Sequence, residues 1–140
     1  MRVLLDTDVG LDFLLGRETF SEAADELFEL IGQGTFDASV APITPINIFY
    51  LARKMQGDDK ARRGIAALLR VVSVCPVNHT ILTGALASPI VDYEDAVQHA
   101  CAAAAGLDAI VTRNLGDYKN ATLPVFSPPD FLNHLKPQQP

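Results

Sequence analysis

The chain has 140 residues, of which 49% are hydrophobic and 20% are charged, with a net charge of −6 at pH 7 and a pI of about 4.8. This acidic balance argues against non-specific binding to nucleic acid through global charge. Without an apolar run of about 18 residues or a signal peptide, we expect one cytoplasmic domain over residues 1–136, no membrane span, and a frayed tail at 137–140.

Apolar residues in the first half of the chain recur at strand and helix periods in turn. We predict that Ser21 caps one helix and that Thr44 caps another, with Pro45 at its first helical position. Gly57 breaks that second helix and a new one follows. The predicted elements are strand 2–6, helix 9–15, helix 18–32, strand 36–41, helix 44–55 and a helix from the 57–59 break to 69.

The second half continues the alternation of strands and helices. The predicted elements are strand 71–75, helix 78–87, helix 93–105, strand 109–112, strand 124–126 and helix 129–135. Cys75 and Cys101 lie in apolar segments without zinc-ligand spacing, which indicates buried thiols in a reducing compartment. Helices alternating with apolar strands predict an α/β fold with a parallel sheet sandwiched between helices.

Acidic residues stand where predicted strands end or helices begin. Asp6 closes the first strand, Asp95 opens the helix at 93–105, and Asp117 follows the strand at 109–112. Strand carboxyl ends gather at one edge of a parallel sheet, and that edge is where ligands bind. Crowded carboxylates repel each other and are usually accompanied by a cation, and hard oxygen ligands suit Mg²⁺ or Mn²⁺.

Each of these acids also has a purely structural interpretation. Asp6 or Asp8 can cap the helix that follows the first strand. Asp92 fits a capping box, and Asp117 can form a turn with Gly116. It is their shared place at one predicted edge that favours a functional site.

Three stretches of the chain resemble the motifs of the PIN domain family, and more narrowly its VapC-type toxins. These stretches are residues 4–9 (LLDTDV), 92–98 (DYEDAVQ) and 111–118 (VTRNLGDY). The resemblance spans nearly the whole chain, in the family's order and spacing. It implies a three-layer α/β/α sandwich with a mainly parallel sheet of four to five strands, and a Mg²⁺- or Mn²⁺-dependent endoribonuclease that hydrolyses RNA phosphodiester bonds.

The resemblance also assigns roles to residues of the expected site. The family's metal-site acids correspond to Asp6 and Asp95, and its last acid corresponds to Asn114 or Asp117. Thr112 matches a small polar residue beside that cluster. We therefore expect Asp6, Asp95 and Asp117 as metal ligands, with Asn114 among the catalytic residues.

One position departs from the family pattern. The family places a glutamate early in the helix after the second strand, whereas this chain has Asn47 there. An amide oxygen can ligate a metal but brings no charge, so a weakened activity is expected. Asn47 can instead be a capping partner of Thr44, and Asp8, where the family often has asparagine, can return some of the charge.

Two other functions compete with the nuclease. Because position 47 is neutral, the chain can be a catalytically inactive PIN-like binding module. The segment Asp6-Thr7-Asp8 after a strand also resembles the nucleophile motif of haloacid dehalogenase-like phosphatases, and Gly116-Asp117 resembles their late acidic motif. No lysine stands in the place that such a phosphatase needs.

The VapC-type resemblance also implies partners, namely RNA as substrate, a cognate antitoxin, and a second copy in a homodimer. Phe49-Tyr50 and Leu68-Leu69 are candidate contacts, although burial in the core explains such residues equally well. Basic residues cluster at Arg53-Lys54 and between Lys60 and Arg63, where the sequence alone favours a solvated helix face.

Overall fold

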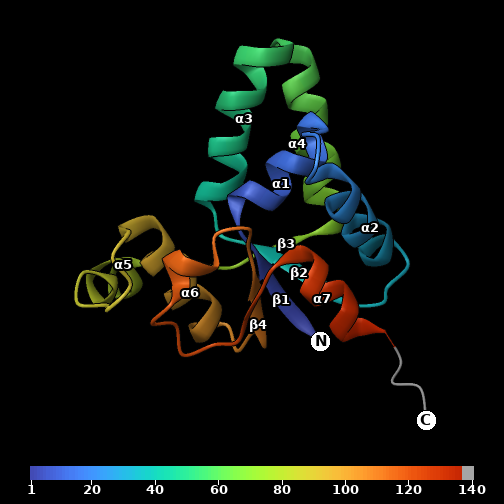
Figure 1. Ribbon diagram of the computed structural model, residues 1–140. Helices are drawn as coiled ribbons and strands as arrows, with labels where there is room; N and C mark the ends of the chain where they lie inside the picture. Colours follow the sequence, from blue (N-terminus) through green and yellow to red (C-terminus); the bar gives the residue numbers. More distant parts are fainter. Residues whose placement is uncertain (137–140) are drawn as a thin grey trace.

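The computed structural model describes residues 1–136 and has one five-stranded sheet at its centre (Figure 1). All neighbouring strands are parallel, in the order β3-β2-β1-β4-β5. The strands are β1 (Arg2–Leu5), β2 (Asp37–Val40), β3 (Ser73–Val74), β4 (Ala109–Val111) and β5 (Val125–Phe126). The predicted α/β/α fold with a parallel sheet is confirmed, and residues 137–140, predicted as a frayed tail, lie outside the described residues.

Seven α-helices and one 3-10 helix surround the sheet within residues 1–136. They are α1 (Thr7–Leu15), α2 (Ser21–Gly32), α3 (Ile43–Gln56), α4 (Asp58–Val71), α5 (His79–Ala85), α6 (Tyr93–Ala104), the 3-10 helix η1 (Leu115–Tyr118) and α7 (Pro128–Leu135). Every predicted α-helix is present, and the short 3-10 helix was not predicted.

Two hydrophobic cores lie on opposite faces of the sheet. Val3 and Leu5 of β1 belong to the core shared with α1, α2, α3, α4 and α7, whereas Leu4 belongs to the core shared with α5 and α6. Successive side chains of a strand point to opposite faces, so burial on both sides requires a continuous apolar run. This explains why β1 and β4 carry no polar residue in their interiors.

Two predicted helix caps are wrong. Ser21 is the first residue of α2, and its cap position, Phe20, makes no side-chain cap hydrogen bond. Thr44 lies inside α3, which begins at Ile43, and its fully buried hydroxyl is 3.0 Å from the hydroxyl of Thr7. Tertiary burial therefore decides where these residues lie, against their local preference for helix ends.

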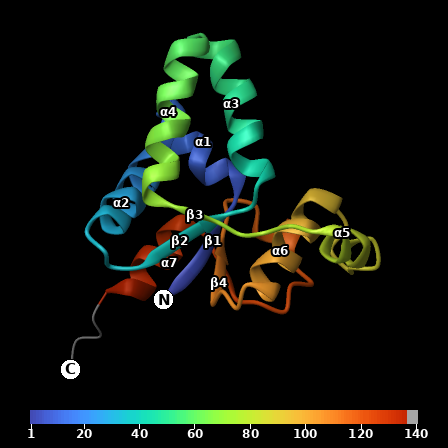
Figure 2. The same ribbon diagram turned by 180° about the vertical axis from the view of Figure 1, so that it is seen from behind.

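Helices α3 and α4 form an antiparallel hairpin that stands out from the sheet (Figures 1 and 2). Gly57 joins them with φ of 88°, a left-handed value that glycine adopts without strain. At its base α3 approaches α1 closely, because a Cβ on Gly10 would lie 2.7 Å from Ile48 Cδ1. This contact sets the first turns of α3 beside the end of β1.

Two remaining sequence expectations concern the thiols and the membrane. Cys75 and Cys101 are free and buried, as predicted. No described helix combines the length and the apolar character that a membrane crossing needs.

Candidate active site at the carboxyl edge of the sheet

Asp6 lies at the centre of the carboxyl edge, directly between β1 and α1. It caps α1 as predicted: its Oδ1 accepts a hydrogen bond from the Thr7 backbone N–H at 2.7 Å and another from Gln98 Nε2 at 3.0 Å. Its Oδ2 accepts from the Thr112 hydroxyl at 2.8 Å. Asp6 as a whole residue is 6% exposed. Three donors from two helices and the end of β4 thus hold one buried charge in a fixed orientation.

Gln98 and Thr112 are themselves fully buried. Thr112 Oγ1 accepts from the Asn114 backbone N–H at 3.0 Å, and its hydroxyl donates to Asp6 Oδ2 at 2.8 Å, with Asp8 Oδ2 as a longer acceptor at 3.4 Å. Gln98 Oε1 has no hydrogen-bond partner among residues 1–136. Thr112 therefore lies beside the acid cluster as the resemblance implied, whereas Gln98 was missed.

Asp8 lies in the first turn of α1 and faces the loop after β4. Its Oδ2 accepts from Asn114 Nδ2 at 2.9 Å and from the Arg113 backbone N–H at 3.2 Å. Burial and the nearby charge of Asp6 raise the pKa of Asp8 to about 6. Its Oδ1 is buried without a hydrogen-bond partner in the described part of the chain. Asn114 is thus directed at Asp8 rather than at Asp6.

Asp95 lies in the first turn of α6, which Asp92 caps by accepting from the Asp95 backbone N–H at 3.0 Å. The Tyr118 hydroxyl donates to Asp95 Oδ1 at 3.3 Å. Burial and then the charges of Asp6, Asp92 and Asp117 raise the pKa of Asp95 to about 7. The predicted metal-site acids therefore share one electrostatic environment.

Asp117 differs from Asp95 in being exposed, in the 3-10 helix η1. With Asp92, Tyr93 and Lys119 it lines an open cleft of about 570 Å³. Its backbone N–H donates to the Asn114 carbonyl at 3.0 Å. The predicted turn around this residue exists as part of η1, and its carboxylate faces solvent beside the α6 N-terminus.

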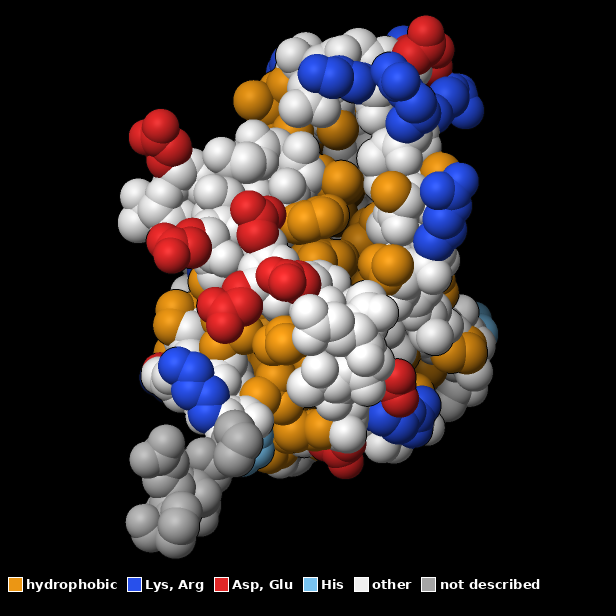
Figure 3. Space-filling view, turned by 90° about the vertical axis from the view of Figure 1, so that its right-hand side faces the viewer, with side chains coloured by type: hydrophobic (Ala, Val, Ile, Leu, Met, Phe, Trp, Pro, Cys, Tyr) orange, Lys and Arg blue, Asp and Glu red, His pale blue; other side chains and the backbone are white. Residues whose placement is uncertain are grey.

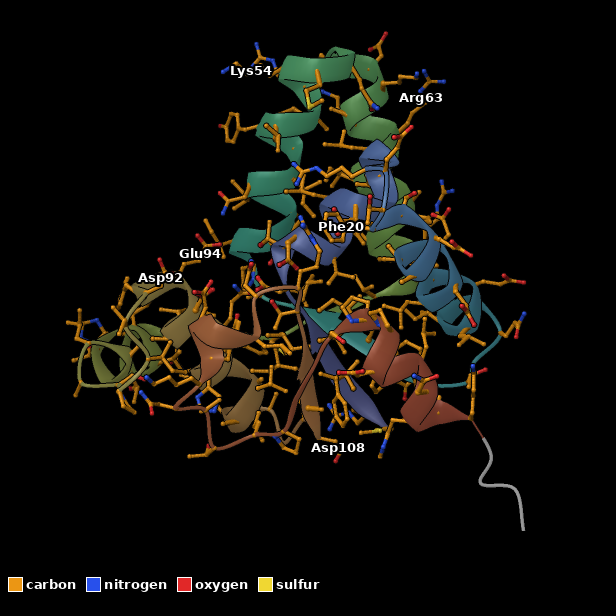
Figure 4. The ribbon with its side chains drawn as sticks, in the orientation of Figure 1. Phe20, Lys54, Arg63, Asp92, Glu94 and Asp108 are labelled. Carbon is orange, nitrogen blue, oxygen red and sulfur yellow. The ribbon has the colours of Figure 1, made fainter. Side chains whose placement is uncertain are left out.

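Asn47 occupies the neutral position of the site and makes a contact that sequence reasoning missed. Its Nδ2 donates to Glu94 Oε1 at 3.1 Å, and the start of α3 has no side-chain cap hydrogen bond, so the proposed capping with Thr44 is wrong. Figure 4 shows Glu94 and Asp92 beside the lower end of α3, while Asp108 lies at the opposite end of the sheet. Burial and the charges of Asp6 and Asp92 raise the pKa of Glu94. The only sequence signal for Glu94 was its place next to Asp95.

Arg113 donates its backbone N–H to Asp8, and its side chain is already engaged elsewhere. Its Nε lies 2.7 Å from Oδ2 of the buried Asp12, an ion pair without the alignment of a good hydrogen bond. Its guanidinium carbon also lies 3.9 Å from the ring centre of Phe20. Within residues 1–136, no Lys or Arg forms an ion pair with Asp6, Glu94 or Asp95.

The oxygen atoms at this edge are of the chemical type that binds a hard divalent cation, but the side chains that carry them are not close enough together to bind one. Carboxylate oxygens from Asp6, Asp95 and Asp117, with Glu94 beside them, are the ligands that Mg²⁺ and Mn²⁺ prefer. Their mutual repulsion is what a cation would relieve. Nevertheless, no three His, Cys, Asp or Glu side chains in the described residues are close enough together to hold a metal ion. Binding would therefore require side-chain rearrangement at the exposed acids.

Comparison with known proteins points to one family. A family model described as PIN domain matches residues 2–116. Three similar solved structures are DNA-bound VapBC from Salmonella typhimurium, VapBC2 from Rickettsia felis bound to a promoter DNA fragment, and VapC20, a sarcin-ricin loop cleaving toxin from Mycobacterium tuberculosis.

The structural likeness is extensive, although the sequences are distant. The Salmonella chain has a TM-score of 0.69 at 20% identity, covering 91% of this chain and 98% of that chain. The Rickettsia chain has a TM-score of 0.67 at 13% sequence identity, covering 91% of this chain and 98% of that chain. The Mycobacterium chain has a TM-score of 0.66 at 15% sequence identity, covering 86% of this chain and 95% of that chain. A comparison with curated protein sequences found no match.

Proposed function

The chain belongs to the PIN domain family, and from that premise we propose that it is a Mg²⁺- or Mn²⁺-dependent endoribonuclease of VapC type. The observation that carries the proposal is the placement of three acids at the carboxyl edge of the sheet, with Asp6 between β1 and α1, Asp95 in the first turn of α6 and Asp117 in η1. Family membership also removes the support for the haloacid dehalogenase-like alternative, because the Asp6-Thr7-Asp8 segment is accounted for by the PIN motif.

Asp6, Asp95 and Asp117 would hold the cation, with Asn114 and Glu94 at its margin. When bound, such a cation lowers the pKa of a water and offsets charge on the scissile phosphate. The hydrogen bonds from Gln98 and Thr112 hold the Asp6 carboxylate in a fixed orientation at this edge. Asp8 remains a candidate for returning the charge that Asn47 lacks.

The protein's own groups also control protons at this edge. Burial and the charges of Asp6, Asp92 and Asp117 raise the pKa of Asp95 to about 7, and a cation held beside it would favour the charged carboxylate. The Tyr118 hydroxyl, whose pKa is raised by burial and by the charges of Asp6 and Asp95, stays protonated and donates to Asp95. Tyr118 is therefore a positioning residue for the carboxylate.

The test is cleavage of RNA in Mn²⁺, with and without a chelator. Asp6→Asn and Asp95→Asn should abolish cleavage. Asp108→Asn is the matched control, because this acid lies at the far end of the sheet and an amide oxygen can still accept from the Arg2 backbone N–H (Figure 4). Cleavage that survives both Asp6→Asn and Asp95→Asn would rule out the metal-nuclease mechanism.

The neutral Asn47 favours a second candidate, a PIN-like module that binds RNA or a protein without cutting. Its amide donates to Glu94 and is therefore turned toward an acid in the cation-free site. Thermal unfolding with added Mn²⁺ separates the two candidates. A cation-dependent rise in melting temperature that is lost in Asp95→Asn supports the nuclease, whereas no rise together with no cleavage supports the module.

We further propose the partners that VapC-type toxins have, namely a cognate antitoxin and a second copy of the chain. Exposed Tyr50 and Leu69 provide apolar surface for such contacts. A dimer in light scattering is the expected result, and a monomer at micromolar concentration would contradict the homodimer.

A further inference from the structure

The end of the α3–α4 hairpin is basic in an otherwise acidic protein. Residues 53–63, called the hairpin tip below, hold five of the eleven basic residues and two acids, a net charge of +3. The rest of the chain has six basic and fifteen acidic residues, a net charge of −9. Figure 3 shows the Lys and Arg side chains gathered at the tip, with most Asp and Glu side chains of that face below them.

The charges at the tip are exposed and only partly paired. Asp58 accepts from Arg62 Nε at 2.7 Å and lies 4.0 Å from Arg53 Nε. Lys54, Lys60 and Arg63 make no ion pair within the described residues 1–136. Figure 4 shows Lys54 and Arg63 extending into solvent from opposite sides of the hairpin. Three cationic groups thus remain available to an anionic partner.

Helix stability explains only some of these residues. Arg53 and Lys54 lie in the last turn of α3, where a positive charge interacts favourably with the helix dipole. Lys60 lies in the first turn of α4, where the same dipole disfavours positive charge, whereas Arg63 lies in the second turn, beyond the reach of the dipole. Stabilisation by the helix dipole therefore accounts for neither of these two residues.

The tip is connected to the candidate site by one face of α3. Asn47, Tyr50 and Lys54 are separated by three and four residues and therefore share a helix face. Tyr50 is 61% exposed, and an exposed aromatic ring can stack on an unpaired base. With a rise of about 1.5 Å per residue, Lys54 at the tip lies about 10 Å along α3 from Asn47, a span of a few nucleotides in an extended single strand.

We infer that the hairpin tip binds the phosphate backbone of single-stranded RNA a few nucleotides away from the cleaved bond. The inference rests on the proposed function for the identity of the polymer. Contacts to phosphate position a substrate without reading its sequence. The tip therefore contributes affinity for RNA of any sequence, which an acidic protein cannot obtain from its global charge.

The experiment measures RNA binding without cleavage. The Asp95→Asn protein, in chelator, is titrated onto a fluorescent unstructured RNA 20-mer, and anisotropy is followed across a range of salt concentrations. Adding Lys54→Gln and Arg63→Gln removes two phosphate contacts. This should weaken binding by about 25-fold at 0.1 M salt and reduce the slope of log affinity against log salt by about 1.4.

Adding Arg70→Gln and Lys136→Gln instead is the matched control, since it removes one exposed Arg and one exposed Lys outside the tip. Affinity and salt slope should then stay as in Asp95→Asn alone. Equal weakening by the two pairs, or none by the tip pair, overturns the inference even if the wild-type protein cuts RNA. Tip-dependent RNA binding supports the inference even if no cleavage is found. Tip-dependent binding of polyglutamate, with no binding of RNA, overturns it in favour of a protein partner.

Discussion

The two principal carboxylates of the candidate site, Asp6 and Asp95, differ in how their charge is balanced. Asp6 is buried, accepts three hydrogen bonds, and is held by groups from α1, α6 and the end of β4. Asp95 accepts one long hydrogen bond from Tyr118 and is exposed to the repulsion of three other acids. The fold holds Asp6 in place with hydrogen bonds, whereas the repulsion on the Asp95 carboxylate is not offset by any comparable set of hydrogen bonds.

The difference indicates which part of the site is built for stability and which part for a ligand. Hydrogen bonds to a charged carboxylate stabilise both the charge and the surrounding structure. A carboxylate that is destabilised by its neighbours costs folding free energy, and such groups cluster at functional sites. Removing Asp6 should therefore cost both stability and activity, whereas removing Asp95 should cost activity without a comparable loss of stability.

The largest effect is expected from Asp6→Ala. It removes the cap of α1 and leaves the Gln98 amide and the Thr112 hydroxyl without their buried acceptor. Together these losses should lower the free energy of unfolding by about 2–3 kcal/mol in urea titrations. Asp95→Ala is the comparison and should change it by less than about 1 kcal/mol. Equal destabilisation by the two substitutions would contradict the distinction between the two acids.

A smaller loss is expected from Thr112→Val, which keeps the side-chain shape and removes the hydroxyl. Asp6 then loses one of its three donors and the Asn114 backbone N–H loses its acceptor. The expected cost is about 1–2 kcal/mol of unfolding free energy. Thr80→Val, at an exposed position of α5, is the control and should stay within about 0.5 kcal/mol of the wild-type value. If Thr112→Val is as stable as the control, the hydroxyl does not support Asp6.

Most of the fold could be predicted from the sequence because its signals are local. Apolar runs at 2–6 and 109–112, with helical spacing between them, imply parallel strands. In the structure β1 and β4 are neighbours, which brings Asp6 and the loop after β4 together as expected. The misplaced caps at Ser21 and Thr44 show the opposite case, where burial overrides a local preference.

The details of the site depend on contacts that sequence spacing does not report. Asn47 and Glu94 are 47 positions apart and meet through the packing of α3, whose Ile48 lies against Gly10 of α1. Gln98 lies in the PIN-like stretch 92–98, but its position in the sequence does not show that its amide donates to Asp6, 92 positions away. The pairing of Arg113 with Asp12 was hidden for a similar reason, since neither residue belongs to a pattern of charges.

Asn47→Glu tests the part of the site around Glu94, where acids lie together without a basic partner among residues 1–136. The substitution replaces an amide donor with a second carboxylate beside Glu94, so the cation-free protein should lose about 1 kcal/mol of unfolding free energy. The affinity for Mn²⁺, measured by calorimetry, should rise because the site gains a charged ligand. The double variant Asn47→Glu/Glu94→Gln is the control that exchanges the two groups, and it should recover the lost stability. An Asn47→Glu protein as stable as wild type would show that the two side chains do not interact.

The smallest expected effect is on how the stability of the protein changes with pH. Because the pKa of Asp95 is raised from 3.8 to about 7, the folded protein binds this proton more tightly than the unfolded chain. The stability linked to this group is therefore complete below about pH 4 and is lost as the pH rises toward 7. Asp8, with its pKa raised to about 6, adds a decline in the same direction. Urea midpoints should thus fall between pH 4 and 7, and Asp95→Asn should flatten part of that decline, while Asp108→Asn should leave it unchanged. A decline that is as steep in Asp95→Asn as in the wild type would mean that Asp95 is balanced in the folded protein, as Asp6 is.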